Sequence, residues 1–503
     1  MKKKYDILII GSGLGGLVSA LILAKEGLKV GILEKNQQLG GNLQTFSRNK
    51  VIFDTGVHYL GGLSEGQNLY RYFNFLGIMQ HLNLKKMDEV FDRITFDNDP
   101  TEYPQSQGAE NFVKNLAVYF PEEEENIRKY CREIHNVCTK FPRYFLVNEG
   151  SYDEHTLYRN TKDFINSITE NPKLRAVLAG NSFLYAGNEK TPLYVHALTV
   201  NSYIKSAYKC LQGGSQITKL LVRELRKYDV EIFKRTEATA FTKDESNKLI
   251  SVKTGNGKEF FADHFVSNIE LETTFQLSGE ETFKKAFVSR VKSLKPLISS
   301  FSVYLVLKPH SFKNFNFNYF HNRNSEEFLT NLEEYNSENW PQFYMLSSVE
   351  SIKNKGFAES FTILTCMNYD EVKKWENTIN TIANPNERNE EYEQFKKEKA
   401  EILIKEIEKK FPDIREHIQE IYTSSPLSYR DYIGTKNGSI YGYEKDSENP
   451  YKTMFSPKTK IENLFVTGQT VNMHGILGVT VGAFTTCAEI VGAERIDEIL
   501  KHF

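Results

Sequence analysis

Glycines near the start of the chain have the spacing of a turn that binds a dinucleotide phosphate. Gly11, Gly13 and Gly16 follow a short apolar run, and a helical pattern continues to about Leu23. Gly11 permits a tight turn, Gly13 lets the backbone approach a pyrophosphate, and Gly16 allows the helix to pack close to the strand. The unpaired N–H groups at the positive end of the helix dipole would then bind the pyrophosphate.

A carboxylate follows at the distance that such a site needs. Glu34 lies eighteen residues beyond Gly16, at the end of a second apolar run over residues 29–33. A carboxylate at this point can accept hydrogen bonds from both hydroxyls of an adenosine ribose. Because a strand, a helix and an acid surround the glycines, the pattern predicts a dinucleotide-binding unit far more specifically than glycines alone.

Three further side chains are candidates for proton chemistry, namely His58, Tyr59 and His474. A histidine can give or take a proton near neutral pH, and Tyr59 can donate a hydrogen bond or stack on a conjugated chain. The alternative, which we favour, is that both histidines only hydrogen-bond loop backbone or cofactor carbonyls. Arg430 is expected to pair with Asp431 or another loop carboxylate rather than to take part in catalysis.

Composition narrows the class of protein. The chain has 503 residues, enough for two or three domains and a large core. Its net charge of -2 gives no electrostatic reason to expect nucleic acid as a partner. The five cysteines are scattered without a CxxC pair, so neither a disulfide framework nor a metal site is indicated. We therefore expect a cytoplasmic protein without a metal.

The first third of the chain contains the elements that would position these residues. After the nucleotide unit, the pattern predicts a hairpin at 45–54, in which Asp54 is expected to brace its turn, and a mostly helical region at 69–209. Within that region, Pro142 to Tyr144 and Pro192 to His196 are candidates to line a cavity.

The middle of the chain returns to the nucleotide pattern and then becomes strand-rich. A glycine turn at 212–215 precedes a predicted helix and several strands. The predicted elements are a helix at 217–227, strands at 230–233 and 264–267, then strands at 298–307, 315–320, 343–348 and 361–367, and a charged helix at 389–411. The strands after residue 296 suggest a mostly antiparallel sheet. Phe315, Phe317 and Tyr319 alternate on one face, which is interpreted as sheet core rather than as the floor of a pocket.

The last segment completes the nucleotide domain. No regular element is clear at 426–443, a buried strand is predicted at 463–468, and a loop then leads to a small-residue helix at 479–491. A helix that begins near Gly478 would bring N–H groups to the far side of the cofactor. Such donors stabilise the negative charge that a flavin gains on reduction, whereas NAD needs no second site of this kind. The layout therefore favours FAD.

The same segments resemble a known superfamily. GSGLGGLVSALILAKEGLKVGILEKNQQLGGN, FDTG, LQGGS and LFVTGQTVNMHGILGVTVGA look like the flavin-dependent phytoene desaturase, carotenoid isomerase and retinol saturase superfamily. The phrases DTGVHYLGG, PLSYRDYIGTKNGSIYG and GQTVNMHGILGV look most like the retinol saturase subgroup. The resemblance implies an α/β fold in which a Rossmann-like FAD-binding domain of the glutathione-reductase type carries an inserted α+β substrate domain. The expected bounds are 1–75, 205–275 and 425–503 for the discontinuous FAD-binding domain, and 76–204 and 276–424 for the substrate or lid domain.

The resemblance also implies which residues bind a non-covalent FAD. By position, the ribityl chain and the ring would meet the end of the chain, and the adenine would meet the strand near Ala238. The expected cofactor-binding residues are Gly11, Ser12, Gly13, Gly15, Gly16, Glu34, Lys35, Gly40, Gly41, Asn42, Gly56, Ala238, Gly468, Gln469, Gly478 and Val479.

Members of this superfamily add or remove hydrogen at carbon–carbon bonds of long apolar polyenes, or isomerise them. We expect an FAD-dependent oxidoreductase of a carotenoid-like or retinoid-like polyene, with saturation slightly favoured. A desaturase or a cis–trans isomerase on the same fold is the first alternative, and an amine oxidase or a flavin-free carrier of prenyl lipids is less favoured. NAD(P)H or another external electron donor, and peripheral association with the inner face of a membrane, are hypotheses, and the sequence leaves the oligomeric state open.

Overall fold

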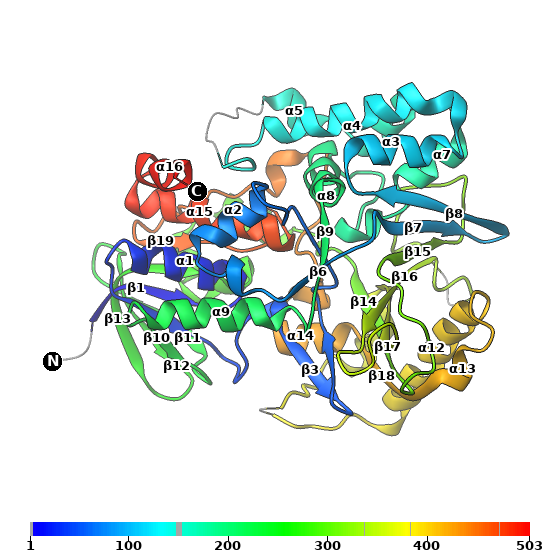
Figure 1. Cartoon of the computed structure of the whole chain (residues 1–503). Helices are drawn as coiled ribbons and strands as arrows, with labels where there is room; N and C mark the ends of the chain where they lie inside the picture. The colour runs from blue at the N-terminus through cyan, green and yellow to red at the C-terminus, as the bar shows by residue number, and fades with distance from the viewer. Residues whose placement is uncertain (1–3, 147–152, 336–337, 383, 472, 503) are drawn as a thin grey trace.

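The structure is a computed structural model that describes residues 4–146, 153–335, 338–382, 384–471 and 473–502. Two seven-stranded sheets lie side by side, and a layer of helices lies above the second sheet in the view of Figure 1. The first and last segments of the chain meet at the first sheet. The predicted domain bounds remain a prediction.

The first sheet is the nucleotide-binding type of sheet that the glycine pattern predicts. Its order is β10-β2-β1-β13-β12-β11, with β19 paired to β13. Strands β10, β2, β1, β13 and β19 run parallel, so their carboxyl ends share one edge. The bounds are β1 (Lys4–Ile10), β2 (Val30–Leu33), β10 (Glu231–Phe233), β11 (Ala238–Lys243), β12 (Leu249–Thr254), β13 (Glu259–Ser267) and β19 (Leu464–Val466).

Three helices cover one side of this sheet: α1 (Leu14–Lys25), α9 (Ser215–Arg226) and α15 (Gly475–Val491). Helix α1 packs against both α9 and α15 and is buried almost throughout. A Cβ atom at Gly16 would lie 2.2 Å from the Gly11 carbonyl oxygen, which confirms that the close approach of α1 to its strand requires glycine. Helix α15 begins four residues before the predicted Val479. Two glycines in its first turn, Gly475 and Gly478, weaken the helical pattern there.

The second sheet has the order β18-β14-β17-β16-β15-β7-β8, and its only parallel pair among the described strands is β15 with β7. This confirms the mostly antiparallel sheet. Phe317 and Tyr319 lie in its core and Phe315 packs against them, which confirms the core interpretation. The bounds are β7 (Val90–Phe96), β8 (Asp99–Ser106), β14 (Ser299–Leu307), β15 (Asn318–Asn322), β16 (Phe343–Glu350), β17 (Ala358–Met367) and β18 (Ile418–Ser424).

The prediction of a mostly helical region at 69–209 is wrong at its two ends. Strands β7 and β8 form a hairpin that joins the second sheet, and β5 (Leu60–Gly61), β9 (Ala207–Cys210) and β6 (Leu84–Lys86) form a small sheet of their own. A two-residue turn at Asp97-Asn98, with Asn98 at φ 59°, was the available signal for the hairpin. Pro104 is compatible with β8 because that strand lies at the sheet edge.

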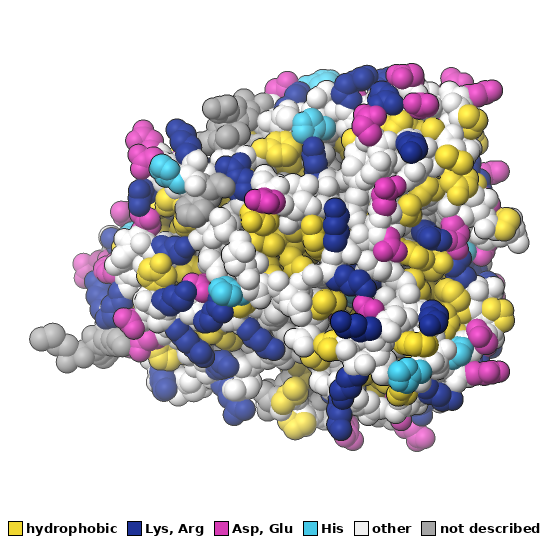
Figure 2. All heavy atoms as spheres, in the orientation of Figure 1, with side chains coloured by type: hydrophobic (Ala, Val, Ile, Leu, Met, Phe, Trp, Pro, Cys, Tyr) yellow, Lys and Arg dark blue, Asp and Glu magenta, His cyan; other side chains and the backbone are white. Residues whose placement is uncertain are grey.

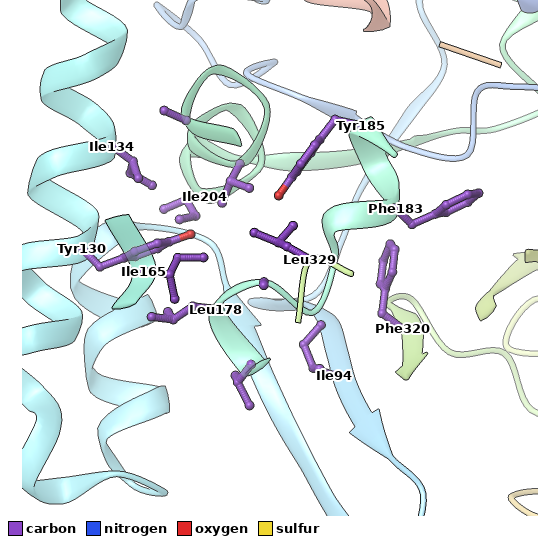
Figure 3. Packing of buried hydrophobic residues seen from close by; sticks show 14 of the residues in the cluster. Ile94, Tyr130, Ile134, Ile165, Leu178, Phe183, Tyr185, Ile204, Phe320 and Leu329 are labelled. Atoms are coloured by element: carbon purple, nitrogen blue, oxygen red, sulfur yellow. The ribbon is translucent and has the colours of Figure 1, made fainter. Parts of the chain in front are cut away.

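The interior of the region is helical, and its helices pack over the sheet through a large apolar core. Figure 3 shows side chains from helices and strands converging there, with Tyr130 and Tyr185 among them. Both tyrosine hydroxyls hydrogen-bond the ring of His196, at 2.6 and 2.7 Å. The helices are α3 (Ala109–Ala117), α4 (Glu124–Thr139), α5 (Glu154–Tyr158), α6 (Thr161–Ile168), α7 (Pro172–Leu178) and α8 (Leu193–Lys205).

The remaining elements complete the two halves. The hairpin β3 (Thr45–Arg48) and β4 (Val51–Asp54) and the charged helix α12 (Glu390–Glu408) agree with the predictions. Helix α14 (Pro426–Ile433) lies where no regular element was expected, although Ser425 caps it, Pro426 begins it and Gly434 ends it at φ 85°. The others are α2 (Asn68–Phe75), α10 (Leu271–Leu277), α11 (Lys285–Lys292), α13 (Ile414–His417) and α16 (Ala493–Lys501).

The surface carries charges of both signs. In the face shown in Figure 2, Lys and Arg side chains gather at the lower left, where Figure 1 places α9. Helix α9 has Arg223 and Arg226 in its last turn, a position that suits the negative end of the helix dipole. In the described part of the chain, no helix is long and apolar enough to cross a membrane.

Candidate functional site

A cavity of about 440 Å³ lies at the carboxyl edge of the first sheet, where the residues after β1, β2, β13 and β19 converge. A groove outside the carboxyl ends of parallel strands is where doubly wound sheets bind ligands. Most of the predicted cofactor residues line it, together with one of the three proton candidates. They are Gly11, Ser12, Gly13, Gly15, Glu34, Lys35, Gly40, Gly41, Asn42, Gly56, His58, Ala238, Gly468, Gln469 and Val479.

Four predicted residues lie elsewhere. Gly16 is at the contact of α1 with its strand. Gly478 faces the backbone and Cβ of Met473 and, like His474, lines a second cavity. Tyr59 lines neither of these cavities, because its ring is buried against Tyr203 with the centroids 4.4 Å apart.

Glu34 is held by the turn that it faces. Its Oε2 accepts hydrogen bonds from the Ser12 N–H at 3.0 Å and the Ser12 hydroxyl at 2.6 Å, and its Oε1 accepts from the Asn36 N–H at 2.8 Å. These bonds fix the carboxylate at the cavity wall. Oε1 accepts only one of these bonds and keeps a lone pair, so Glu34 can still accept from a ribose hydroxyl.

Asn268, which follows β13, is a site residue that the sequence reasoning missed. In the amide orientation that satisfies both polar atoms, its oxygen accepts from the N–H groups of Gly13 and Gly16, at 3.3 Å each. It therefore occupies the N-terminus of α1, where a pyrophosphate would bind. The available signal was a polar residue directly after a buried strand that runs beside β1.

The segment after β18 contributes three tyrosines to the site. Tyr429 and Tyr432 of α14, with Tyr441 beyond it, line the nucleotide cavity.

Asp54 braces a neighbouring turn rather than its own, because its Oδ1 accepts from the Gly214 N–H at 2.6 Å. Burial raises the pKa of Asp54 to about 7.

The residues present fit a flavin dinucleotide. Glycines form much of one wall, and a Cβ atom at Gly41 would lie only 3.3 Å from the Cα of Gly13. Side chains at these two positions would fill the space that a pyrophosphate needs. The cavity also extends from Glu34 and Ala238 to Gly475 and Ile476 at the start of α15, so an extended ligand has polar contacts at one end and a helix N-terminus at the other.

A second, more apolar cavity of about 360 Å³ adjoins the first, and Gly475 and Ile476 line both. It follows α15 and is also lined by residues of α5 and α8. Pro142, Tyr144 and Tyr194 line it, so both segments expected to line a cavity do so. The other lining residues include leucines, Met454, Met473 and Val481.

The two histidines are neutral at physiological pH. Burial, with a smaller effect of the Lys209 charge, lowers the pKa of His58 to about 4. Burial also lowers the pKa of His474 to about 3. Each has a buried Nε2 without a hydrogen-bond partner among the described residues. Neither histidine can donate a proton as an imidazolium at neutral pH. The unpartnered Nε2 of each neutral ring can still accept a hydrogen bond in the tautomer that carries its proton on Nδ1.

Next to the site, Tyr59 belongs to a buried polar cluster that was not predicted. Its hydroxyl donates to Asp92 at 2.8 Å, and Asp92 also accepts from Asn318 at 3.0 Å. Burial raises the pKa of Asp92 to about 7 and lowers the pKa of Lys209 to about 7. Lys209 donates to the Ser348 carbonyl at 2.8 Å. Among the described residues, no group of His, Cys, Asp and Glu side chains could hold a metal ion.

We expect Lys209→Met to change how stability depends on pH. An unfolded lysine titrates near pH 10.4 and the buried Lys209 near pH 7, so between these values the unfolded chain binds more protons and stability rises with pH. The free energy of unfolding of the wild type should therefore rise by about 1–2 kcal/mol relative to the variant between pH 7 and pH 8.5. Urea unfolding at several pH values measures this difference.

The choice of a control variant depends on the charged groups that surround Lys209. Asp92 and Asp88 raise the pKa of Lys209, and Lys85 lowers it. Removing Lys209 also takes a positive charge from beside Asp92, which acts in the same direction as the prediction. Lys397→Met, at an exposed lysine of α12 that is not among the charges acting on Lys209, should follow the wild-type curve. Parallel curves for the wild type and Lys209→Met would show that Lys209 is not buried as described.

The comparisons with known proteins agree with this geometry. A family model described as an NAD(P)-binding Rossmann-like domain matches residues 9–76. The chain is 24% identical to the all-trans-retinol 13,14-reductase of Macaca fascicularis over 97% of its own length and 86% of the relative. It is 23% identical to prolycopene isomerase 1 of an Oncidium hybrid cultivar over 98% of its length and 84% of the relative.

Among solved structures, a putrescine oxidase variant covers the whole of both chains with a TM-score of 0.65 at 12% identity. This likeness shows a shared fold. The sequence similarity fits the superfamily that the motifs resemble, and the comparisons support a flavin cofactor.

Proposed function

We propose that this protein is an FAD-dependent oxidoreductase that acts on a carbon–carbon double bond of a long, apolar polyene, with saturation of the bond preferred. The observation that carries the proposal is the apolar cavity that meets the nucleotide cavity at Gly475 and Ile476. Relatives named as a retinol reductase and a prolycopene isomerase support the choice of a polyene.

We propose that the chain binds FAD without a covalent bond. The turn from Gly11 to Gly16 and Asn268 would bind the pyrophosphate, Glu34 the ribose, and the strand that begins at Ala238 the adenine. Lys35, Gly40, Gly41, Asn42, Gly56, Gly468, Gln469 and Val479 would line the remainder of the cofactor, as their place on the cavity suggests. FAD, when bound, supplies hydride exchange with the substrate.

The residues of the chain position the substrate and exclude water. Tyr441 and His474 stand at the junction of the two cavities, with their ring centroids 4.8 Å apart. An extended conjugated substrate spreads charge over its own π-system, so the site needs no ionised acid or base. The neutral His58 and His474 are consistent with this requirement.

The direct test is the mass of the product. Protein reduced under anaerobic conditions and incubated with all-trans-retinol should give a product heavier by two hydrogens. Leu198 is buried on the apolar cavity, and Leu198→Trp should obstruct it, lowering turnover about tenfold or more without loss of flavin. A wild-type protein that binds flavin but changes neither the mass nor the geometry of polyenes would refute the proposal.

Isomerisation is the second candidate, and the prolycopene isomerase relatives favour it. It gives a product of unchanged mass, so the same experiment separates the two activities. Amine oxidation is less favoured because, among the described residues, no carboxylate lines the apolar cavity to neutralise a cationic amine. A flavin-free carrier of prenyl lipids would not require the glycine-lined cavity or Glu34. A purified protein without flavin colour would favour such a carrier.

A reductase requires electrons from outside, and NAD(P)H or another donor remains our hypothesis. Loss of the flavin absorbance when NADPH or NADH is added without oxygen would identify the donor. Persistent colour with both would point to a protein or small-molecule donor of another kind.

We also propose that the protein docks on a membrane surface while it takes up its substrate. Tyr158 and Tyr451 are 46% and 47% exposed, with ring centroids 6.4 Å apart, and they lie close in sequence to Leu157 and Met454, which line the apolar cavity. Aromatic rings of this kind suit a lipid interface. We expect sedimentation with liposomes that persists at moderate salt and decreases in Tyr158→Ser. Protein that stays in the supernatant with substrate present would contradict this.

A further inference from the structure

One charged side chain lies on the wall of the second cavity, which is mostly apolar. Among the described residues that line it, Arg143 is the only one that carries a charge at neutral pH, because burial keeps His474 neutral. Arg143 is 6% exposed. A guanidinium cannot lose its proton in a protein, so a buried arginine needs acceptors around it.

Only some of the hydrogen-bond donors of the Arg143 guanidinium have an acceptor among the described residues. One terminal nitrogen of Arg143 donates to Asp497 Oδ1 at 3.1 Å, whereas its Nε–H is buried and has no acceptor in the part of the chain that the structure describes. Buried donors without partners are uncommon in folded proteins and costly. A free Nε–H next to a terminal N–H is one edge of the guanidinium fork, the edge that binds the two oxygens of a carboxylate.

The backbone fixes Arg143 in this place. Its φ is 63°, an uncommon conformation for a residue with a side chain. The carbonyl of Arg143 accepts hydrogen bonds from the Tyr72 hydroxyl and the Leu146 N–H. Conformations of this kind are often retained at functional sites.

Arg143 lies near the later turns of α15, away from the junction at Gly475. The Tyr72 hydroxyl donates to the Arg143 carbonyl, and the Tyr72 ring centroid is 4.8 Å from that of Phe484. An ion pair ties Arg143 to Asp497 on α16, the helix that follows α15. The cavity follows α15 from Gly475, at the junction, to Thr485, ten residues further, which is roughly 15 Å along the helix axis. A ligand that reaches from the junction to Arg143 is therefore an extended chain with its polar group at the far end.

From this geometry we propose that Arg143 binds a carboxylate at the end of the apolar substrate, so that the preferred substrate is a polyene or isoprenoid acid rather than a pure hydrocarbon. This inference rests on the proposed function, because it concerns the substrate of the same site. The carboxylate would share the guanidinium with Asp497 and complete its hydrogen bonding.

The test compares three probes in the flavin-loaded protein: all-trans-retinoic acid, its methyl ester, and the C20 hydrocarbon of the same polyene. Binding is followed by the change in flavin absorbance. The wild type should bind the acid about tenfold to hundredfold more tightly than the ester. Arg143→Met, which keeps an apolar stem as far as the position of Nε, should lose that preference while it binds the hydrocarbon within about threefold of the wild type.

A second variant separates binding from a structural role. Asp497→Asn leaves Arg143 in place but removes its counter-charge, so acid binding should be equal to that of the wild type or tighter. An ion pair that only stabilises the fold would weaken all probes in both variants. Equal affinity of the wild type for acid and ester, or a preference that survives in Arg143→Met, would overturn the inference. Failure of all three probes to bind the wild type would instead count against the proposed function.

Discussion

Gly13→Ala is expected to give a folded protein that has lost its flavin. The backbone of Gly13 (φ -61°, ψ 171°) is one that alanine adopts readily, and the nearest atom to an added Cβ is a terminal atom of the movable Asn268 amide, at 2.8 Å. The methyl group would nevertheless point into the space that a pyrophosphate needs. Loss of two charge-assisted hydrogen bonds weakens binding about 100-fold or more, while the unfolding free energy of the flavin-free protein should change by about 1 kcal/mol or less.

The measurements are the flavin absorbance per mole of purified protein and the dissociation constant on adding FAD back. Gly27→Asn is the matched control. Gly27 also lies next to α1, at φ 84°, a conformation that asparagine tolerates, and no atom lies within 4 Å of an added Cβ. It should keep wild-type flavin content. A Gly13→Ala protein that binds FAD as tightly as the wild type would exclude the glycine turn as the pyrophosphate site.

This prediction depends on the part of the site that the sequence displays best. The turn from Gly11 to Gly16, the helix after it and Glu34 lie within thirty residues, so the local spacing fixes their geometry. The second end of the cavity was placed less well. Helix α15 begins at Gly475, whose φ of 76° suits a glycine, rather than at Gly478.

Long-range contacts account for the rest of what the sequence did not reveal. Asp92 and Lys209 are more than one hundred residues apart, and only the pairing of β7 with β15 and the position of β9 bring them together around Tyr59. Helix α14 is a different case, since Ser425, Pro426 and Gly434 are ordinary helix boundary signals. The many tyrosines and glycines of that segment obscured them.

Helix α14 is held in place by a buried ion-pair cluster. Asp431 accepts from Arg388 at 2.5 Å, from Arg430 at 2.6 Å and from the Asn380 N–H at 2.9 Å. The pairing of Arg430 with Asp431 confirms the ion pair expected from the sequence. The side chains of Asp431 and Arg388 are 0% and 4% exposed, so water contributes almost nothing to satisfy either charge.

Asp431→Asn should therefore destabilise the protein by about 3–5 kcal/mol, because it leaves two arginines next to one neutral oxygen and an NH2 group that cannot accept their hydrogen bonds. The lower stability of α14 should also weaken cofactor binding, since Tyr429 and Tyr432 of this helix line the nucleotide cavity. The free energy of unfolding, measured in urea, should decrease. The temperature at which flavin fluorescence appears on heating should decrease as well. Asp370→Asn is the matched control: its pair with Lys373 spans 3.9 Å between exposed side chains and should contribute about 0.5 kcal/mol or less. If the two variants were equally stable, water would have to reach Asp431, and α14 would be a loosely held wall of the cavity instead of a fixed one.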